Sequence, residues 1–347
     1  MFTHCHRGSG NICYDDLQAS PRSKSITLTL LIVGLILLLS GGVGMVRGAS
    51  GLAEGYGVPP LVVGMTVVAF GTSAPELVVN VVGALGGETA LAFGNITGSN
   101  LANIGLVLGT AAVITPIALE GKIIRRELPL LLLATAVLLI MTLDHSLRLS
   151  APVLDRSDAV VMLLLFGIFI YITVMDFLRQ RQDPLLTTIV DIPFASHLEK
   201  KANWILVIVG IAALTLGAKL TIDNGADLAA SMGVSPVIVG MLLVAVGTSL
   251  PELVTSIFAA LKGDADLCVG NVIGSNIFNS MFVLPTSALI HPLAVPAGGS
   301  VDIFVSLVFS ITLIPVFIVG RTIMSRQIGA AFLVAYASYM LARYYFS

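Results

Sequence analysis

Residues 64–103 read GMTVVAFGTSAPELVVNVVGALGGETALAFGNITGSNLAN, and residues 240–279 read GMLLVAVGTSLPELVTSIFAALKGDADLCVGNVIGSNIFN. The two stretches align at a constant offset of 176 residues without a gap, and 21 of the 40 aligned positions are identical. Each copy carries one glutamate in the middle of an otherwise apolar run, Glu76 in the first copy and Glu252 in the second. The chain therefore contains an internal repeat with one acid at the centre of each copy.

The composition indicates an integral membrane protein. Hydrophobic residues make up 56% of the chain and charged residues 11%, with a mean hydropathy of +0.98, whereas soluble domains are about 25% charged. Apolar runs of roughly 17 to 25 residues, the length of a membrane-spanning helix, recur along the chain. The alternating pattern of a transmembrane barrel is absent. No basic cluster suggests nucleic acid, and Cys5, Cys13 and Cys268 have neither disulfide-framework nor metal-ligand spacing.

Ten apolar segments follow one another from residue 26 onward, and the polar stretch 179–202 divides them into two groups of five. Because each half has an odd number of spans, the second copy enters the membrane from the opposite side. We therefore predict an all-α membrane protein with ten transmembrane helices as two inverted five-helix repeats. The expected parts are a polar N-terminal tail 1–25, a first repeat 26–178, a short cytoplasmic linker 179–202 and a second repeat 203–347. The expected spans are 26–46, 58–85, 90–118, 128–143, 158–178, 203–219, 234–261, 267–291, 301–320 and 328–344.

Lysine and arginine placement predicts the orientation, because these residues are more frequent in cytoplasmic loops. Eleven of the 18 Lys and Arg residues fall on the side opposite the N-terminus, and seven fall on the N-terminal side. This distribution predicts a multi-pass protein of the plasma membrane with both termini outside. Three of the seven, Arg7, Arg22 and Lys24 in the tail, favour the reverse orientation.

Each copy interrupts its apolar run with the same break, Gly-Thr-Ser-x-Pro-Glu, at 71–76 and at 247–252. Proline has no N–H and clashes with the carbonyl four residues earlier, so Pro75 should free the carbonyl of Gly71, and the second copy should behave alike. An unpaired carbonyl is costly in hydrocarbon, so such breaks persist where they line a cavity or bind a ligand. Burying the charged side chain of each glutamate in the membrane adds a cost of roughly 2.5–3.5 kcal/mol.

A second break, Gly-Asn-x-x-Gly-Ser-Asn, follows at 94–100 and at 270–276. Its glycines should let helices approach closely. If the copies face each other, they combine two carboxylates, four hydroxyls, amides and carbonyls, which are hard oxygen ligands without His or Cys. This set favours Ca²⁺ or an alkali ion over Zn or Cu. Pairs three or four residues apart share a helix face: Ser73 with Glu76, Ser249 with Glu252, Ser99 with Asn103, and Ser275 with Asn279.

Each motif alone also has a purely structural interpretation. A proline kink in a membrane helix is often only structural, and a Gly-x-x-x-Gly pattern is often a helix-packing motif. Two matched copies in an inverted pair favour an ion site over both interpretations.

At these residues the sequence resembles the cation/calcium exchanger superfamily, the Na⁺/Ca²⁺ antiporters and their relatives, whose two α-repeats carry GTS-x-PE followed by GN-x-x-GSN. The match covers both repeats and the ten-span layout. The resemblance implies a secondary antiporter, not an enzyme, that transports Ca²⁺ and Na⁺ and needs no cofactor. The residues it implies are Glu76 and Glu252 for Ca²⁺ with the carbonyls of Thr72 and Thr248; Ser73, Ser99, Ser249 and Ser275 for Na⁺ with the carbonyls of Ala69 and Ala245; and Asn103 at the family's central amide position.

Two features depart from the relatives. Asn279 stands where some members, including the potassium-dependent branch, have an aspartate. The linker is far too short for the calcium-sensing cytosolic domains of animal exchangers, so that regulation should be absent.

The function we predict is an antiporter that moves Ca²⁺ out of the cytoplasm against Na⁺ entry, by alternating access at a midplane site, as a single chain in the lipid bilayer. The resemblance makes the first and sixth spans the moving gate. A Ca²⁺/H⁺ exchanger that uses the same glutamates as H⁺ carriers is the alternative within transport. A cation channel would need a ring of equivalent ligands from several subunits, and a two-acid intramembrane protease would use aspartates.

Overall fold

The structure is a computed structural model that describes residues 24–58, 60–118, 126–143, 151–180, 198–231, 247–319 and 323–346. Most of these residues are helical, because a helix satisfies its own backbone N–H and C=O groups where no water is available. Within the described residues, six helices are long and apolar enough to cross a membrane, or seven if one bent pair counts as a single span. The six are Ser25–Tyr56, Thr89–Ile114, Arg156–Met175, Lys200–Gly225, Ala265–Ile290 and Gly299–Val316, and the bent pair is Leu61–Thr72 with Ala74–Leu85.

Three predicted spans have no such helix within the described residues. Two of them coincide with shorter apolar helices, α7 (Leu128–Met141) and α12 (Leu250–Leu261). The segment 232–246, before α12, lies outside the described residues. The last predicted span coincides with α16 (Arg326–Phe346), which is long but is not among the six. The ten-span layout therefore stays a prediction.

Two helices extend well past their apolar runs. α1 (Lys24–Tyr56) continues beyond residue 46, and α10 (Lys200–Ser231) continues beyond residue 219. Asp223 and Asp227 lie exposed inside α10 rather than beyond its end. No proline interrupts this stretch, so the helix continues through its polar residues.

The two motif copies fold alike, element by element. α4 (Ala74–Leu85) and α12 have bounds that differ by the 176-residue offset, as do α5 (Thr89–Ala102) and α13 (Ala265–Phe278). A π-helical turn follows each second helix and begins at the motif asparagine. The remaining parts are α2 (Pro60–Val63), η2 (Gly64–Val68), α3 (Ala69–Thr72), η3 (Asn103–Leu108), α6 (Gly109–Ile114), η5 (Asn279–Val283) and α14 (Leu284–Ile290).

Two short antiparallel pairings join the halves of the chain. β1 (Ile117–Ala118) pairs with β4 (Ile323–Met324), and β2 (Val153–Leu154) pairs with β3 (Leu293–Ala294). The helices that follow cross over in the same way, because α16 packs on α6 and α9 packs on α14. The last helix of each half, α9 or α16, therefore packs against the other half. The two helices not yet bounded are α9 (Arg156–Gln180) and α15 (Gly299–Val319).

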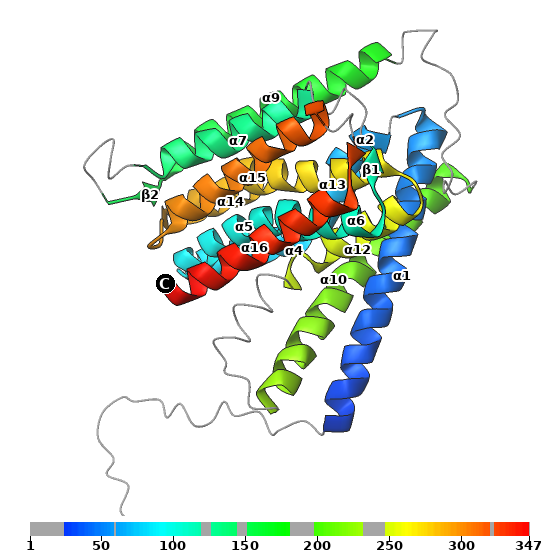
Figure 1. Ribbon diagram of the computed structural model, residues 1–347, viewed down its shortest axis with the longest axis horizontal. Helices are drawn as coiled ribbons and strands as arrows, with labels where there is room; N and C mark the ends of the chain where they lie inside the picture. The colour runs from blue at the N-terminus through cyan, green and yellow to red at the C-terminus, as the bar shows by residue number, and fades with distance from the viewer. Residues whose placement is uncertain are drawn as a thin grey trace, which may run out of the picture.

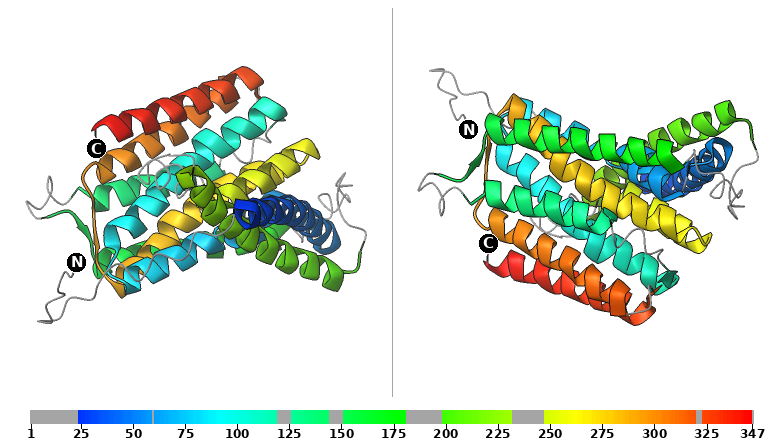
Figure 2. Two further views of the ribbon diagram at one scale, coloured as in Figure 1. Left: turned by 90° about the horizontal axis from the view of Figure 1, so that it is seen from below. Right: turned by 90° about the horizontal axis from the view of Figure 1, so that it is seen from above.

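The motif helices form the centre of the bundle. In the most apolar 18 residues of each span, 78% are buried in segment 89–114 and 94% in segment 265–290. The corresponding share is 33% or less in the other four candidate spans of the described residues. Figure 2 shows α15 and α16 side by side at one edge of the stack. α1 and α10 form a separate pair that crosses the stack obliquely and extends beyond it (Figure 1).

α1 and α10 run antiparallel with their backbones in contact. A Cβ placed on Gly41 would lie 2.9 Å from the Leu214 nitrogen, and one on Gly217 would lie 2.7 Å from the Leu38 nitrogen. The two contacts are equivalent in the repeat, because Gly217 and Leu214 stand 176 positions after Gly41 and Leu38. Small residues thus allow the two long helices to pack closely, as they do in many membrane proteins.

The glycine contact predicts a stability difference between two Gly→Ala substitutions. Gly217→Ala should destabilise the protein by about 1–3 kcal/mol, because its methyl group meets backbone rather than a mobile side chain. Gly167→Ala is the control, since no described residue lies within 4 Å of a Cβ there and alanine favours a helix by about 1 kcal/mol. Thermal unfolding in detergent measures both. Equal unfolding midpoints for the two variants would contradict the close contact.

Candidate functional site

The helix that carries the first motif bends at Ser73. The stretches Leu61–Thr72 and Ala74–Leu85 meet at an angle of 44°. Ser73 has φ −84° and ψ 6°, and its counterpart Ser249 has φ −85° and ψ 5°, so the two copies break in the same way. The proline follows in the first turn of the next helix, where a missing N–H is tolerated.

The carbonyl of Gly71 is not left unpaired by Pro75. N–H groups at the end of α3 donate to the carbonyls of Ala69 and Gly71, and the N–H of Ser73 lies 3.0 Å from the Ala69 oxygen. The prediction of a free Gly71 carbonyl is therefore wrong, because the cap supplies an N–H in place of the one that proline lacks.

Glu76 and Glu252 are fully buried in the first turns of α4 and α12. The positive end of a helix dipole stabilises a carboxylate at this position. The Ser99 hydroxyl donates to Glu76 Oε1 at 3.4 Å, and the Ser275 hydroxyl donates to Glu252 Oε1 at 3.5 Å. The other oxygen of each carboxylate, Oε2, has no hydrogen-bond partner among the described residues. Each glutamate thus has one oxygen held by its own half and one oxygen with free lone pairs.

Threonines of the two breaks cross between the halves. The Thr72 hydroxyl donates to Asn271 Oδ1 at 3.0 Å, and the Thr248 hydroxyl donates to Asn95 Oδ1 at 3.3 Å. The two contacts are related by the 176-residue offset, so each half donates an equivalent hydrogen bond to the other. The same threonines meet serines of the opposite half, Thr72 with Ser275 at 3.4 Å and Thr248 with Ser99 at 3.2 Å.

Two buried polar residues outside the motifs, Asn80 and Ser256, orient the motif asparagines Asn95 and Asn271. Asn95 Nδ2 donates to Asn80 Oδ1 at 2.7 Å, and Asn271 Nδ2 donates to Ser256 Oγ at 3.0 Å. Because each amide nitrogen is engaged, its Oδ1 is left to accept the threonine hydroxyl. The sequence did contain a signal for these two partners. Asn80 and Ser256 are polar residues inside apolar runs, and each stands 15 positions before the motif asparagine of its copy.

The reciprocal pattern is broken at one serine pair. The Ser73 hydroxyl donates across the halves to Glu252 Oε1 at 3.0 Å. Its counterpart Ser249 is also buried, but within the described part of the chain its Oγ has no hydrogen-bond partner. Glu252 therefore accepts a hydrogen bond that Glu76 lacks.

A row of amides joins the two central helices. Asn103 Nδ2 donates to Asn276 Oδ1 at 2.9 Å, Asn276 Nδ2 to the Asn100 carbonyl at 3.0 Å, and Asn100 Nδ2 to Ser280 Oγ at 2.8 Å. Asn279 is fully buried, and neither polar atom of its amide has a partner in the segments that the structure describes. Of the two predicted amides, Asn103 thus has a side-chain partner, and Asn279 has none among the described residues.

Hydrogen bonds within and between the halves hold Glu76 with Ser99 and Thr248, and Glu252 with Ser73, Ser275 and Thr72, in a buried polar cluster. The side chains of Ser249, Asn103 and Asn279 are buried as well. The Ala69 carbonyl lies at the edge of this cluster and also accepts the Thr72 hydroxyl at 3.3 Å, whereas Ala245 lies outside the described residues. Within the described part of the chain no three His, Cys, Asp or Glu side chains come together, so carboxylate charge in the cluster comes from two residues. The unpartnered atoms are mainly oxygens, and such hard ligands fit Ca²⁺ or Na⁺.

The sequence matches a known family and known proteins over most of its length. The family described as "Sodium/calcium exchanger protein" matches residues 26–175 and 202–345. The chain is 37% identical over 297 residues to the inner membrane protein YrbG of Escherichia coli (strain K12), covering 82% of this chain and 88% of that protein. It is 28% identical over 348 residues to the sodium/calcium exchanger MaX1 of Methanosarcina acetivorans, covering 92% and 99%.

The fold is also similar to a solved structure. A structure of the sodium-calcium exchanger NCX_Mj matches with a TM-score of 0.78 at 28% identity, and the match covers 92% of this chain and 99% of that one. The similarity thus extends from the two motifs to nearly the whole molecule. Because the family match includes both copies of the repeat, this chain belongs to the sodium/calcium exchanger protein family, whose members are transporters rather than enzymes.

Proposed function

We propose that this protein is a secondary antiporter that exchanges Ca²⁺ for Na⁺ across the plasma membrane by alternating access. The observation that carries the proposal is the pair Glu76 and Glu252, both fully buried and each with one unpartnered carboxylate oxygen. The names of two similar proteins, the sodium/calcium exchangers MaX1 and NCX_Mj, support the same ions.

The ligand chemistry explains how the two ions would compete. Ca²⁺ takes six to eight oxygen ligands, and two bidentate carboxylates provide half or more of them while balancing its charge. The carbonyls of Thr72 and Thr248 would complete this site. Na⁺ would use the serine hydroxyls around the same carboxylates together with the carbonyls of Ala69 and Ala245. Because three of these serines hydrogen-bond the carboxylates that would bind Ca²⁺, the two ions would compete for overlapping ligands, which couples their movements.

Removing either carboxylate charge should abolish Ca²⁺ transport. Glu76→Gln and Glu252→Gln keep the shape of the side chain but lose the charge that balances Ca²⁺, so we expect at least a tenfold loss of Na⁺-driven ⁴⁵Ca uptake into proteoliposomes. Glu88→Gln is the matched control, because Glu88 is exposed at the start of α5 and caps no N–H. Near-normal uptake by either buried variant, at equal protein incorporation, would refute the site.

We also propose that the ten spans form two inverted repeats, 26–178 and 203–347, after a polar tail 1–25 and on either side of the linker 179–202. The antiparallel packing of α1 on α10 supports inversion, because these helices occupy the same position in the two halves. The reciprocal contacts of Thr72 and Thr248 support a two-fold relation. The distribution of Lys and Arg favours both termini outside.

Inversion predicts opposite exposure of two equivalent loops. In a cysteine-free background, Glu88→Cys after α4 should react with an impermeant thiol reagent from outside. Lys262→Cys after α12 should react only from the cytoplasmic side. Both positions are exposed in the structure, so reactivity reports the side of the membrane rather than burial. Labelling of both cysteines from one side would end the inverted arrangement.

Asn279 sets the charge of the site. With asparagine rather than aspartate here, the buried cluster has two carboxylates, so one Ca²⁺ leaves it neutral. Three Na⁺, the number that the family resemblance suggests, would leave it at +1. The two half-cycles then differ by one charge. The alternative, a Ca²⁺/H⁺ exchanger, is favoured by the two unpartnered Oε2 atoms, each of which could hold one H⁺. It would balance Ca²⁺ and move no net charge.

Voltage distinguishes the two mechanisms. Na⁺-driven Ca²⁺ flux in liposomes clamped with K⁺ and valinomycin should change several-fold between 0 and 100 mV, since one charge across 100 mV is worth about 2.3 kcal/mol. Asn279→Asp adds a group whose protonation competes with cation binding, so its transport should depend more strongly on pH than that of the wild type. Sodium-driven flux that ignores voltage would refute the charge count. Ca²⁺ flux driven by a pH gradient without Na⁺ would establish H⁺ exchange.

A further inference from the structure

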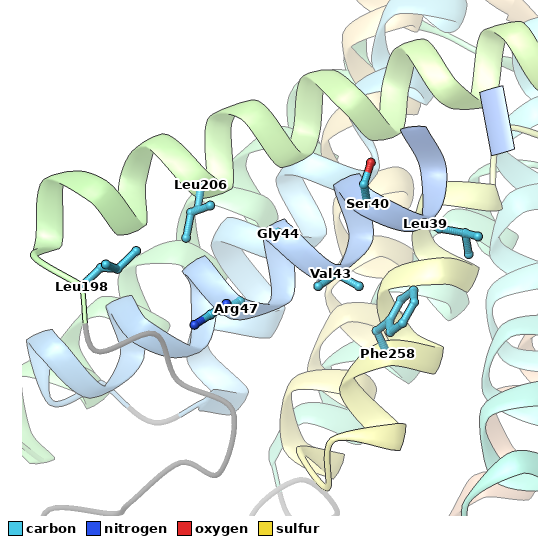
Figure 3. A pocket seen from close by; sticks show the side chains of 8 residues that line it. All are labelled: Leu39, Ser40, Val43, Gly44, Arg47, Leu198, Leu206 and Phe258. Carbon is cyan, nitrogen blue, oxygen red and sulfur yellow. The ribbon is translucent and has the colours of Figure 1, made fainter. Parts of the chain in front are cut away.

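A groove of about 500 Å³ opens on the side of the α1–α10 pair, where α12 packs against α1 (Figure 3). We call it the α1 groove. Its wall is mostly apolar, and Leu39, Val43, Leu206 and Phe258 line it. One charged residue, Arg47, also lines it. The groove is separate from the buried carboxylates, and none of the predicted ion ligands contributes to it.

Arg47 is exposed and makes no hydrogen bond or ion pair with any residue that the structure describes. Figure 3 shows it on the same side of α1 as Val43, toward the end of the groove marked by Leu198. Leu39 and Phe258 lie toward the opposite end. The two ends of the groove therefore differ. The guanidinium of Arg47 lies at one end, and the rest of the groove is lined mostly by apolar side chains.

The neighbouring residues indicate that Arg47 lies at the level of lipid headgroups. A Cβ on Gly48 would lie 2.8 Å from the Asn203 carbonyl, so this turn of α1 is level with Trp204. Trp204 Nε1 lies 3.4 Å from the Tyr56 hydroxyl, and aromatic pairs of this kind mark the membrane interface. From Arg47 back to Leu39 the helix rises about 12 Å, which leads from the headgroups into hydrocarbon.

We propose that the α1 groove binds an anionic phospholipid, with its phosphate on Arg47 and one acyl chain along Leu39, Val43 and Phe258. Guanidinium groups bind phosphate through paired hydrogen bonds, and basic pockets between membrane helices select anionic headgroups. The position is at the seam where α1 meets α12, since a Cβ on Gly42 would lie 2.5 Å from Val254. This proposal does not depend on which ions the protein exchanges.

The single tryptophan of the chain provides the test. Trp204 and Leu206 are two positions apart, so they point about 200° apart around α10, and only Leu206 lines the groove. The double variant Trp204→Phe, Leu206→Trp therefore reports on the groove, and native Trp204 reports on ordinary boundary lipid. Both proteins are reconstituted in phosphatidylcholine with increasing fractions of brominated phosphatidylglycerol or brominated phosphatidylcholine, and tryptophan quenching is measured.

The groove reporter should be half-quenched at a several-fold lower fraction of brominated phosphatidylglycerol than of brominated phosphatidylcholine. Arg47→Gln should remove this preference. Lys201→Gln, which removes an exposed charge of α10 that does not line the groove, should retain it. Native Trp204 should show no preference.

Two results would overturn the proposal. Equal quenching of the groove reporter by the two brominated lipids would mean boundary lipid only. No quenching by either would mean that protein covers the groove. If the double variant does not fold, Ser40→Trp in the Trp204→Phe background repeats the measurement from the α1 wall. Because no transport is measured, the result is independent of the ion assays.

Discussion

The fold depends on keeping two carboxylates inside an apolar helical bundle. Isolated burial of a charge is expensive, and the penalty falls only where hydrogen bonds or a counter-ion replace water. Glu76 and Glu252 obtain part of this replacement from their positions in the first turns of two helices and part from serine hydroxyls. The remaining oxygens point to a cation as the missing partner. The polar interior and the transport chemistry thus follow from the same constraint.

Close approach of the helices makes these hydrogen bonds possible. A Cβ on Gly270 would lie 2.8 Å from the Leu61 carbonyl, and one on Gly274 would lie 2.6 Å from Met65 Cα. The predicted role of these two glycines in packing is therefore confirmed. Gly94 and Gly98 meet nothing among the described residues, and the segment equivalent to their expected partner lies within 232–246. Backbone contact between broken helices brings side chains of opposite halves within hydrogen-bond reach.

Identical residues in the two halves do not have identical surroundings. Ser73 reaches a glutamate of the other half, whereas Ser249 has no partner. Asn103 donates to a neighbouring amide, whereas Asn279 does not. Since the motifs match at these positions, local sequence does not cause the difference. It arises from tertiary contacts.

The sequence by itself determined the helical membrane class, the two breaks and the identity of the buried acids, because these follow from local composition and from the repeat. It did not determine the amides Asn95 and Asn271 as partners of the threonines, the exchange of last helices between the halves, or the pairing of the Gly71 carbonyl. Those features depend on contacts between residues far apart in the chain, such as Thr72 and Asn271, 199 positions apart. Only the tertiary structure decided them, because a hydrogen bond needs an orientation and a distance that residue types and spacing do not fix.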